Sequence, residues 1–201
     1  IFSLAYYINM EQYGSSPKLH GIYYSAPPTE MYRVIAGYNK VDGKYKPYYR
    51  PEYKYDKQFE TIFPRMYSPD SEHEPDYVYW GGVKGRKFTV TSGSGKETVT
   101  CPTFGENLTF FFRYQTGFMY LRYFMWNFVG RQNAEQGFFP WINKDGHWYS
   151  GIKPFDSGRL YNQDHLPRVI REDQSRNSYY FLPFILGILG VVFHFKKNRN
   201  D

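Results

Sequence analysis

Residues 102–133 read PTFGENLTFFFRYQTGFMYLRYFMWNFVGRQN and hold the strongest secondary-structure signals of the chain. Thr103 is followed three residues later by Glu106, the spacing of a capping box, in which each side chain accepts a hydrogen bond from a free backbone N–H at a helix start. Gly130 supplies a residue that tolerates the backbone conformation found at a helix end. The stretch therefore predicts a helix over residues 104–129.

The sides of this predicted helix differ in polarity. At about 100° per residue, one narrow stripe is polar, Gln115 and Arg122 share the opposite side, and the rest is apolar and aromatic. Arginines in the middle of the helix argue against a span exposed to lipid, and the aromatic bulk argues against ordinary exposure to water. Two placements stay open: a helix at a membrane boundary or among other helices, and the central core helix of an outward-facing domain.

The residues before this helix show the alternation and turn pairs of β structure. Residues 31–38 and 45–56 flank Asp42-Gly43, a pair that readily takes positive φ angles, which predicts a hairpin. In its second arm, tyrosines alternate with charged residues, giving an aromatic face and a charged face. Pro47 and Pro51 confine that arm to the edge of a sheet, because proline cannot donate a ladder hydrogen bond.

A second hairpin is predicted from residues 87–91 and 97–101, joined by a Ser- and Gly-rich turn. Its alternation places four side chains on one face, namely Phe88, Val90, Val99 and Cys101, with threonines on the other. Cys101 is the single cysteine of the chain, so an internal disulfide is excluded.

Residues 179–195 read YYFLPFILGILGVVFHF, and Lys196 and Lys197 follow directly. An apolar run of about 17 residues is at the lower limit for crossing a hydrocarbon core of about 30 Å, and basic residues beyond one end favour the cytoplasmic side. The run predicts a transmembrane helix over 179–195, with residues 1–178 in the periplasm. A buried helix of a soluble core is the alternative, but it does not account for the basic residues.

The predicted fold class is α+β: a β-hairpin-rich extracytoplasmic domain, one long aromatic helix and a C-terminal transmembrane helix. The predicted organisation is a β-rich periplasmic loop domain (1–101), the aromatic helix (102–133), a loop-rich connector (134–178), the transmembrane helix (179–195) and a cytoplasmic basic tail (196–201). The predicted location is the bacterial inner membrane.

Several kinds of chemistry are not predicted. The five histidines lack metal-ligand spacing, and no nucleophile-elbow sequence occurs, so neither a metal site nor a hydrolase triad is expected. A net charge of +6 is compatible with a nucleic-acid-binding protein. The basic residues are spread along the chain and do not form one patch, so no nucleic-acid partner is expected. No cofactor and no catalytic residue are predicted.

One group of side chains could bind a ligand. Arg113, Arg122 and Arg131 alternate with tyrosines and with Trp126, and guanidinium groups suit phosphate oxygens, so the group could hold a lipid phosphate. The structural alternative is that these arginines bind helix-end carbonyls and nearby acids.

Four segments in the same order support a resemblance to a known family: YYINMEQYG (6–14), FPRMYS (63–68), the stretch 102–133 quoted above and RNSYYFLPFILGILG (176–190). They resemble a large family of bacterial polytopic membrane proteins, formerly a domain of unknown function and now grouped with GT-C glycosyltransferases related to protein O-mannosyltransferases. The chain resembles an internal fragment of such a protein, a later outward loop with the helix that follows it.

The resemblance implies a parent enzyme that moves a sugar from a polyprenyl-phosphate carrier to a protein or glycan acceptor at the periplasmic face. In such enzymes the catalytic acids lie in an earlier loop within an Asp-Cys-Gly-Glu-Phe-like motif, which this chain lacks, so it is expected to shape the site without catalysing transfer. The matching segment supplies the candidates for contact with carrier or acceptor: Arg122, Trp126, Asn127, Arg131, Gln132 and Asn133. Membrane lipid and other transmembrane helices of the parent are the further expected partners.

A second function of another class stays open. The chain would then be a non-catalytic interaction or assembly domain of a membrane complex, and its aromatic residues, 22% of the chain, would pack against protein partners.

Overall fold

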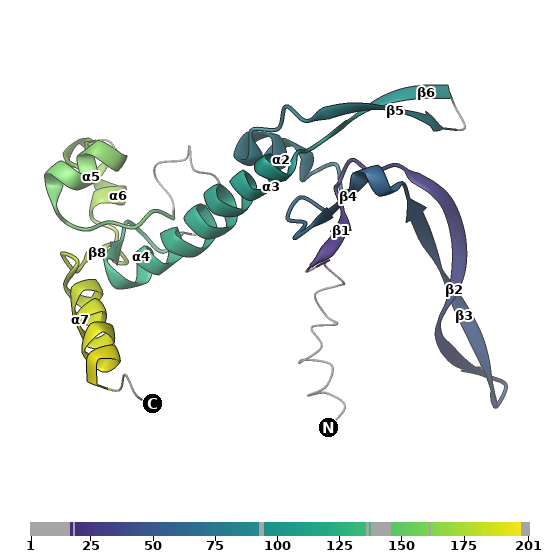
Figure 1. Ribbon diagram of the computed structural model, residues 1–201. Helices are drawn as coiled ribbons and strands as arrows, with labels where there is room; N and C mark the ends of the chain where they lie inside the picture. The colour runs from purple at the N-terminus through teal and green to yellow at the C-terminus, as the bar shows by residue number, and fades with distance from the viewer. Residues whose placement is uncertain are drawn as a thin grey trace. The chain divides into compact units, whose positions relative to one another are not determined.

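The computed structural model describes residues 17, 19–92, 95–135, 137, 146–160 and 162–197 (Figure 1). The chain divides into two compact units, residues 1–113 and 114–201. The first unit contains β1 (His20–Ile22), β2 (Pro28–Val41), β3 (Lys44–Tyr55), the 3-10 helix η2 (Lys57–Phe59), β4 (Glu60–Ile62), α2 (Glu74–Gly81), β5 (Arg86–Ser92), β6 (Gly95–Cys101) and α3 (Phe104–Phe110). A π-helix, η3 (Phe111–Leu121), follows α3, and the second unit continues with α4 (Arg122–Phe128), β7 (Gly130–Arg131), α5 (Lys153–Leu160), the 3-10 helix η4 (Gln163–His165), α6 (Arg168–Arg171), β8 (Asn177–Ser178) and α7 (Leu182–Lys197).

The helix predicted from the capping box is present, but its middle section is a π-helix. The Oγ1 of Thr103 accepts a hydrogen bond from the backbone N–H of Glu106, and the carboxylate of Glu106 accepts one from the N–H of Thr103 at 2.7 Å. Backbone hydrogen bonds in η3 join residues five apart, so its turns are wider than those of an α-helix. The polar stripe expected at 3.6 residues per turn therefore does not continue through η3.

Both predicted hairpins are confirmed, and each forms a separate two-stranded antiparallel sheet. The Asp42-Gly43 turn has φ angles of 51° and 76°, and it joins β2 to β3, whose ladder runs from Val41 opposite Lys44 to Pro28 opposite Tyr55. In the β5–β6 hairpin, Phe88 lies opposite Val99, and Cys101 ends β6 as a buried residue.

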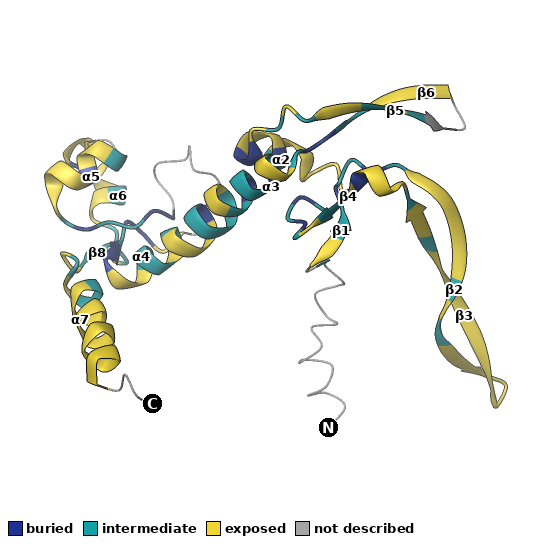
Figure 2. Ribbon diagram, in the orientation of Figure 1, coloured by how far each residue is buried: buried dark blue, intermediate teal, exposed yellow. Residues whose placement is uncertain are grey.

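The first unit has a small aromatic core beneath the ends of these strands. The ring of Tyr77 from α2 packs edge-on against Phe110 of α3 at 5.1 Å, and Phe59 packs against Phe88 at 5.5 Å. Other buried apolar side chains of this unit include Tyr23, Ala26, Met66, Trp80 and Cys101. Figure 2 shows that burial is concentrated here, whereas the β2–β3 ribbon is exposed along most of its length.

The Glu106 carboxylate links the start of α3 to the preceding loop. Besides the capping-box contacts with Thr103, it accepts hydrogen bonds from the N–H groups of Lys84 at 2.7 Å and Gly85 at 3.0 Å. Burial raises the pKa of Glu106, but the hydrogen bonds that the charged form accepts outweigh burial, so the pKa lies below its ordinary value of 4.5.

We expect this carboxylate to make stability depend on pH. Because the folded pKa is lower than the unfolded one, the contribution is present above pH 4.5 and is lost as the pH falls through the folded pKa. Urea unfolding between about pH 3 and pH 7 should show a loss of stability on the acidic side that is smaller in the Glu106→Gln variant, which cannot titrate at this position. Equal pH profiles for the two proteins would contradict this assignment.

The second unit is organised by short extended segments. Gly130 and Arg131 of β7 pair with Ser178 and Asn177 of β8. The backbone of Arg131 also forms an isolated antiparallel β-bridge with that of Trp148. Gly130 has a φ of 131°, and a Cβ atom there would lie 2.5 Å from the carbonyl oxygen of Tyr149. Glycine therefore allows the neighbouring segment to pack directly on the helix end, where the sequence predicted only a residue that permits the helix to stop.

The interior of the second unit is unusually polar. It contains buried polar side chains from several loops and helices, namely Gln132, Asn133, His147, Ser150, Asp156 and Gln163. Few apolar side chains are buried beside them, among them Phe118, Val129 and Leu160. Hydrogen bonds rather than apolar packing must therefore order much of this unit.

The prediction of a C-terminal transmembrane helix is wrong for the part of the chain that the structure describes, because no helix there is long and apolar enough to cross a membrane. The α+β class with small antiparallel sheets is confirmed. α7 has 16 residues and includes Lys196 and Lys197; at about 1.5 Å per residue it is roughly 24 Å long, short of a core of about 30 Å. The apolar residues Tyr179, Tyr180 and Phe181 precede the helix, and the last two have positive φ angles.

The basic tail, the location and the connector were predicted alongside the spanning helix. Residues 198–201 of the predicted basic tail lie outside the described residues. The periplasmic side for residues 1–178 and the inner-membrane location stay predictions, which the spanning helix no longer supports. Within residues 134–178, predicted as loop-rich, the described parts include the short helices α5, η4 and α6.

Candidate functional site

Helix α4 separates two cavities of different chemistry within the second unit. On one side lies a partly polar pocket of about 430 Å³, lined by Arg122, Tyr123, Trp126, Ala134, Glu135 and Gly146. On the other side lies an apolar groove of about 340 Å³ against α7, lined by Phe124, Phe128, Pro183, Phe184, Gly187, Ile188, Val191 and Val192. Helical spacing explains the division, because residues three or four apart share a face of a helix.

Arg122 places a half-buried positive charge at the wall of the polar pocket. Its Nε donates to the carbonyl of Phe118 at 3.0 Å, its Nη1 donates to the carbonyl of Gly146, and its guanidinium lies 4.5 Å from the centre of the Phe118 ring. Burial lowers the pKa of Arg122. No carboxylate among the described residues is within ion-pair distance of Arg122, so neutral acceptors hold the cation in that part of the chain.

Trp126 forms the aromatic wall of the same pocket. Its ring stacks on Tyr123 at 5.9 Å, and the guanidinium of Arg131 lies 4.9 Å from its ring centre. Within the described part of the chain, the buried indole N–H of Trp126 has no hydrogen-bond acceptor. A buried donor without an acceptor is costly, and a ligand oxygen would satisfy it.

A smaller cavity of about 150 Å³ adjoins Trp126 and is also lined by Asn127, Arg131, Asn177 and Tyr179. The Nε of Arg131 donates to the carbonyl of Ser175 at 2.9 Å, and the Asn127 amide donates to the carbonyl of Tyr123 at 2.8 Å. Arg122 and Arg131 thus both donate to backbone carbonyls, as expected if these arginines have a structural role.

The remaining predicted site residues do not line these cavities. Gln132 and Asn133 are buried, and the backbone N–H of Gln132 donates to the carbonyl of His147 at 3.1 Å. Arg113 is exposed at the end of the first unit. The structure therefore brings Arg122 and Trp126 to one pocket and Asn127 and Arg131 to its neighbour, and gives Gln132 and Asn133 structural positions.

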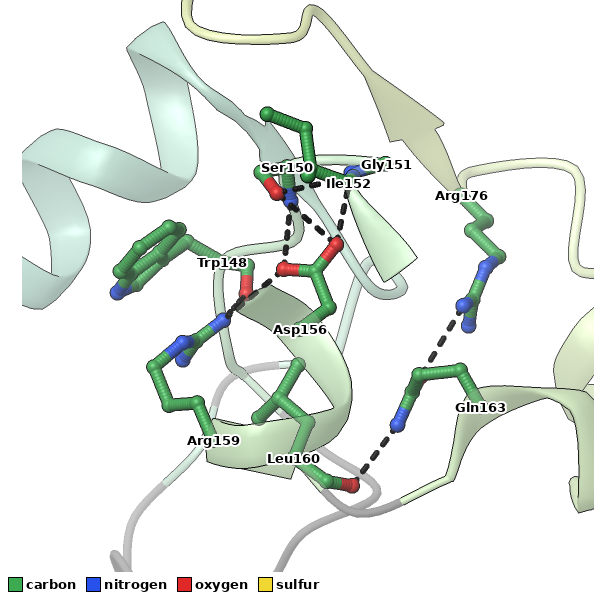
Figure 3. Close-up of polar contacts among 9 residues, drawn as sticks. All are labelled: Trp148, Ser150, Gly151, Ile152, Asp156, Arg159, Leu160, Gln163 and Arg176. Carbon is green, nitrogen blue, oxygen red and sulfur yellow. Dashed lines mark hydrogen bonds and ion pairs between the residues drawn. The ribbon is translucent and has the colours of Figure 1, made fainter. Parts of the chain in front are cut away.

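A buried ionic cluster around Asp156 was not predicted from the sequence (Figure 3). The Asp156 carboxylate is completely buried and accepts hydrogen bonds from the N–H groups of Ser150 at 3.1 Å and Gly151 at 2.8 Å, and from the Ser150 hydroxyl at 3.0 Å. The Nη2 of Arg159 lies 3.9 Å from its Oδ1. The sequence predicted only a loop-rich connector over residues 134–178, whereas Asp156 lies in the first turn of α5.

Arg159 is held between this carboxylate and an aromatic ring. Its guanidinium lies 3.7 Å from the centre of the Trp148 ring and donates to the carbonyl of Trp148. Burial lowers the pKa of Arg159 to about 10, and the charge of Asp156 opposes that change. Because Asp156 is surrounded by donors, it has the contacts of a structural carboxylate rather than of a proton-transfer group.

Side chains that could bind a metal ion together would form another kind of candidate site. Within the described ranges, no group of three His, Cys, Asp or Glu side chains could hold a metal ion.

Comparisons with known proteins give a family of unknown function. Residues 14–112 match the model of the Family of unknown function (DUF8416); the match covers just under half of the chain and lies entirely in the first unit. No curated protein and no solved structure matches the chain at a significant level. The matched family description supplies no activity.

Proposed function

We propose that this chain is the part of a GT-C-like sugar transferase that holds a polyprenyl-phosphate sugar, and that it shapes the site without a catalytic residue of its own. The observation that supports this most is the division made by α4. A pocket with charged and aromatic side chains, among them Arg122, Glu135 and Trp126, lies on one side of the helix, and an entirely apolar groove lies on the other. A polyprenyl-phosphate sugar has the matching division into a polar, anionic end and an apolar chain.

The polar end of such a carrier fits the pocket at Arg122 and Trp126. Phosphate oxygens accept strong hydrogen bonds from guanidinium groups, and the Arg122 cation has no acidic partner among the described residues. The flat face of Trp126 and the donor at its edge suit a sugar ring, which offers both C–H groups and hydroxyls.

The apolar chain fits the groove between α4 and α7. Phe124 and Phe184 meet there with ring centres 6.1 Å apart, and no charged side chain lines the groove. An isoprenoid chain that covered the groove would remove apolar surface from water. The residues of α7 that face away from α4 are exposed as well.

We expect Arg122→Gln to weaken binding of farnesyl phosphate about tenfold, which corresponds to the loss of one charge-assisted contact. Isothermal titration of the full chain with farnesyl phosphate and with farnesol measures the effect. Farnesol lacks the phosphate, so its affinity should not change in the variant. Equal loss for both ligands would show that Arg122 acts only on the fold.

The groove is tested by a pair of glycines on α7. Gly187 lines the groove and Gly190 does not, and a Cβ atom would meet nothing within 4 Å at either position. Gly187→Leu should fill the groove and abolish measurable binding of both ligands, whereas Gly190→Leu should bind as the unchanged protein does. Both changes replace a helical glycine and should not destabilise the helix.

If neither ligand binds the unchanged chain, the proposal of a carrier site is overturned. A chain that binds no amphiphile but forms a stable complex with another protein would support the second function, an interaction or assembly domain.

A further inference from the structure

The β2–β3 ribbon of the first unit has an aromatic face that no other described segment covers. Directly opposite residues of an antiparallel pair share a face, and Met31 lies opposite Tyr53 and Ile35 opposite Tyr49. A ladder irregularity between Ile35 and Gly37 shifts the alternation, as a β-bulge does, so Tyr38 joins the same face. The resulting stripe consists of Met31, Ile35, Tyr38, Tyr45, Tyr49 and Tyr53, which are 45–72% exposed.

This exposure is unusual for a ribbon of two strands. A two-stranded hairpin alone is only marginally stable in water, and a contiguous aromatic patch on a protein surface commonly marks an interaction site. The ladder of β3 also contains Pro47 and Pro51, which blunt its outer edge against pairing with another strand. The face of the ribbon, rather than that edge, is therefore the surface available to a partner.

Charge indicates what kind of partner fits. Residues 28–55 contain six basic and three acidic residues, and two of the acids are already paired, Glu30 with Lys54 and Glu52 with Arg50, each at 2.8 Å. Arg33 and Lys40 lie on the aromatic face, opposite Pro51 and Tyr45. Neither has an ion-pair partner among the described residues.

These two cations exclude a second copy of the same face as the best occupant, because facing ribbons would bring like charges together. Tyrosine rings with hydroxyl groups suit a partner that offers both flat apolar faces and hydrogen-bonding groups. We propose that the aromatic face of β2–β3 binds an extended anionic glycan, with sugar rings stacked on Tyr38, Tyr45, Tyr49 and Tyr53 and acidic groups held by Arg33 and Lys40.

Affinity electrophoresis of the full chain tests this proposal. The gel contains alginate, a carboxylated polysaccharide, or dextran, which is neutral. We expect alginate to retard the protein, and Tyr45→Ala combined with Tyr49→Ala to weaken this binding about tenfold or more. Lys40→Gln should weaken binding to alginate and make that binding less sensitive to added salt, because one fewer ionic contact remains to be screened.

A tyrosine on the other face provides the matched control. Tyr48 lies opposite Gly37 and is 47% exposed, so Tyr48→Ala removes the same side chain from the same strand and should keep the affinity for alginate. Circular dichroism of each variant checks that the ribbon is retained. Trp126→Ala, which alters the pocket of the second unit, should also leave alginate binding unchanged, so failure of the carrier proposal and failure of this one are distinguishable.

Three results would overturn the proposal. They are no retardation by alginate, equal loss in the Tyr48→Ala control, and binding only to vesicles of anionic phospholipid or only to a single-stranded oligonucleotide. The last two ligands test the membrane surface and the nucleic acid that a basic aromatic ribbon could otherwise bind.

Discussion

Replacing Asp156 with alanine is expected to lower the free energy of unfolding by about 3–5 kcal/mol, the range found when one partner of a buried ion pair is removed. The carboxylate is completely buried and accepts three hydrogen bonds from Ser150 and Gly151. Its loss leaves these donors unsatisfied and leaves the Arg159 cation, 3.9 Å away, without a counter-charge among the described residues. Urea unfolding followed by tryptophan fluorescence measures the change.

Asp164 supplies the control for this experiment. It also pairs with a cation, Lys153 at 3.1 Å, but both side chains are exposed, so Asp164→Ala should cost no more than about 1 kcal/mol. Arg159→Met combined with Asp156→Ala should recover part of the stability, because the double change removes the buried cation together with its partner. A cost for Asp156→Ala equal to that for Asp164→Ala would refute the role given to the buried pair.

The elements with local signals were predictable from the sequence. The capping box at Thr103 and Glu106, the Asp42-Gly43 turn and the alternation in β5 and β6 each act over a few residues, and each is present in the structure. Helix α2 was not predicted. Its sequence, Glu74 to Gly81, has almost no separation of apolar and polar sides, and the preceding prolines and acids are typical of a loop.

The candidate site was predictable only in part, because only some of its residues belong to a local sequence pattern. Arg122 and Trp126 were identified by residue type and by resemblance, and they line one pocket. The facing residues Glu135 and Gly146 come from a separate segment, so their proximity depends on tertiary structure. The Asp156 cluster likewise depends on a carboxylate meeting the backbone of Ser150 and Gly151, for which a single sequence has no local pattern.

The error at the C-terminus has a definite origin. Residues 179–195 were counted as one apolar run, whereas the structure turns at Tyr180 and Phe181 and begins α7 at Leu182. Composition shows how apolar a stretch is, but the helix length depends on where the backbone turns. Part of this run instead lines the groove beside α4, namely Pro183, Phe184, Gly187, Ile188, Val191 and Val192.

In the first unit, Asn107→Ala should lower the free energy of unfolding by about 2–4 kcal/mol, since each buried polar group left unsatisfied costs roughly 1–3 kcal/mol. The completely buried Asn107 amide joins α3 to the segment 63–66. Its Oδ1 accepts hydrogen bonds from the N–H groups of Arg65 at 2.8 Å and Met66 at 3.3 Å, and its Nδ2 donates to the carbonyl of Phe63 at 2.9 Å. Thermal and urea unfolding of the full chain measure the loss.

Two further variants separate the amide contacts from general effects of the substitution. Asn39→Ala removes an exposed asparagine of β2 and should change stability by no more than about 0.5 kcal/mol. Asn107→Asp keeps an acceptor for Arg65 and Met66 but cannot donate to Phe63 when ionised, so it should be destabilised most at neutral pH and recover as the carboxyl is protonated in acid. If Asn107→Ala unfolds like Asn39→Ala, the segment 63–66 is held by its apolar contacts, such as the edge-on packing of Phe63 on Phe111 at 5.1 Å, and the amide is not required.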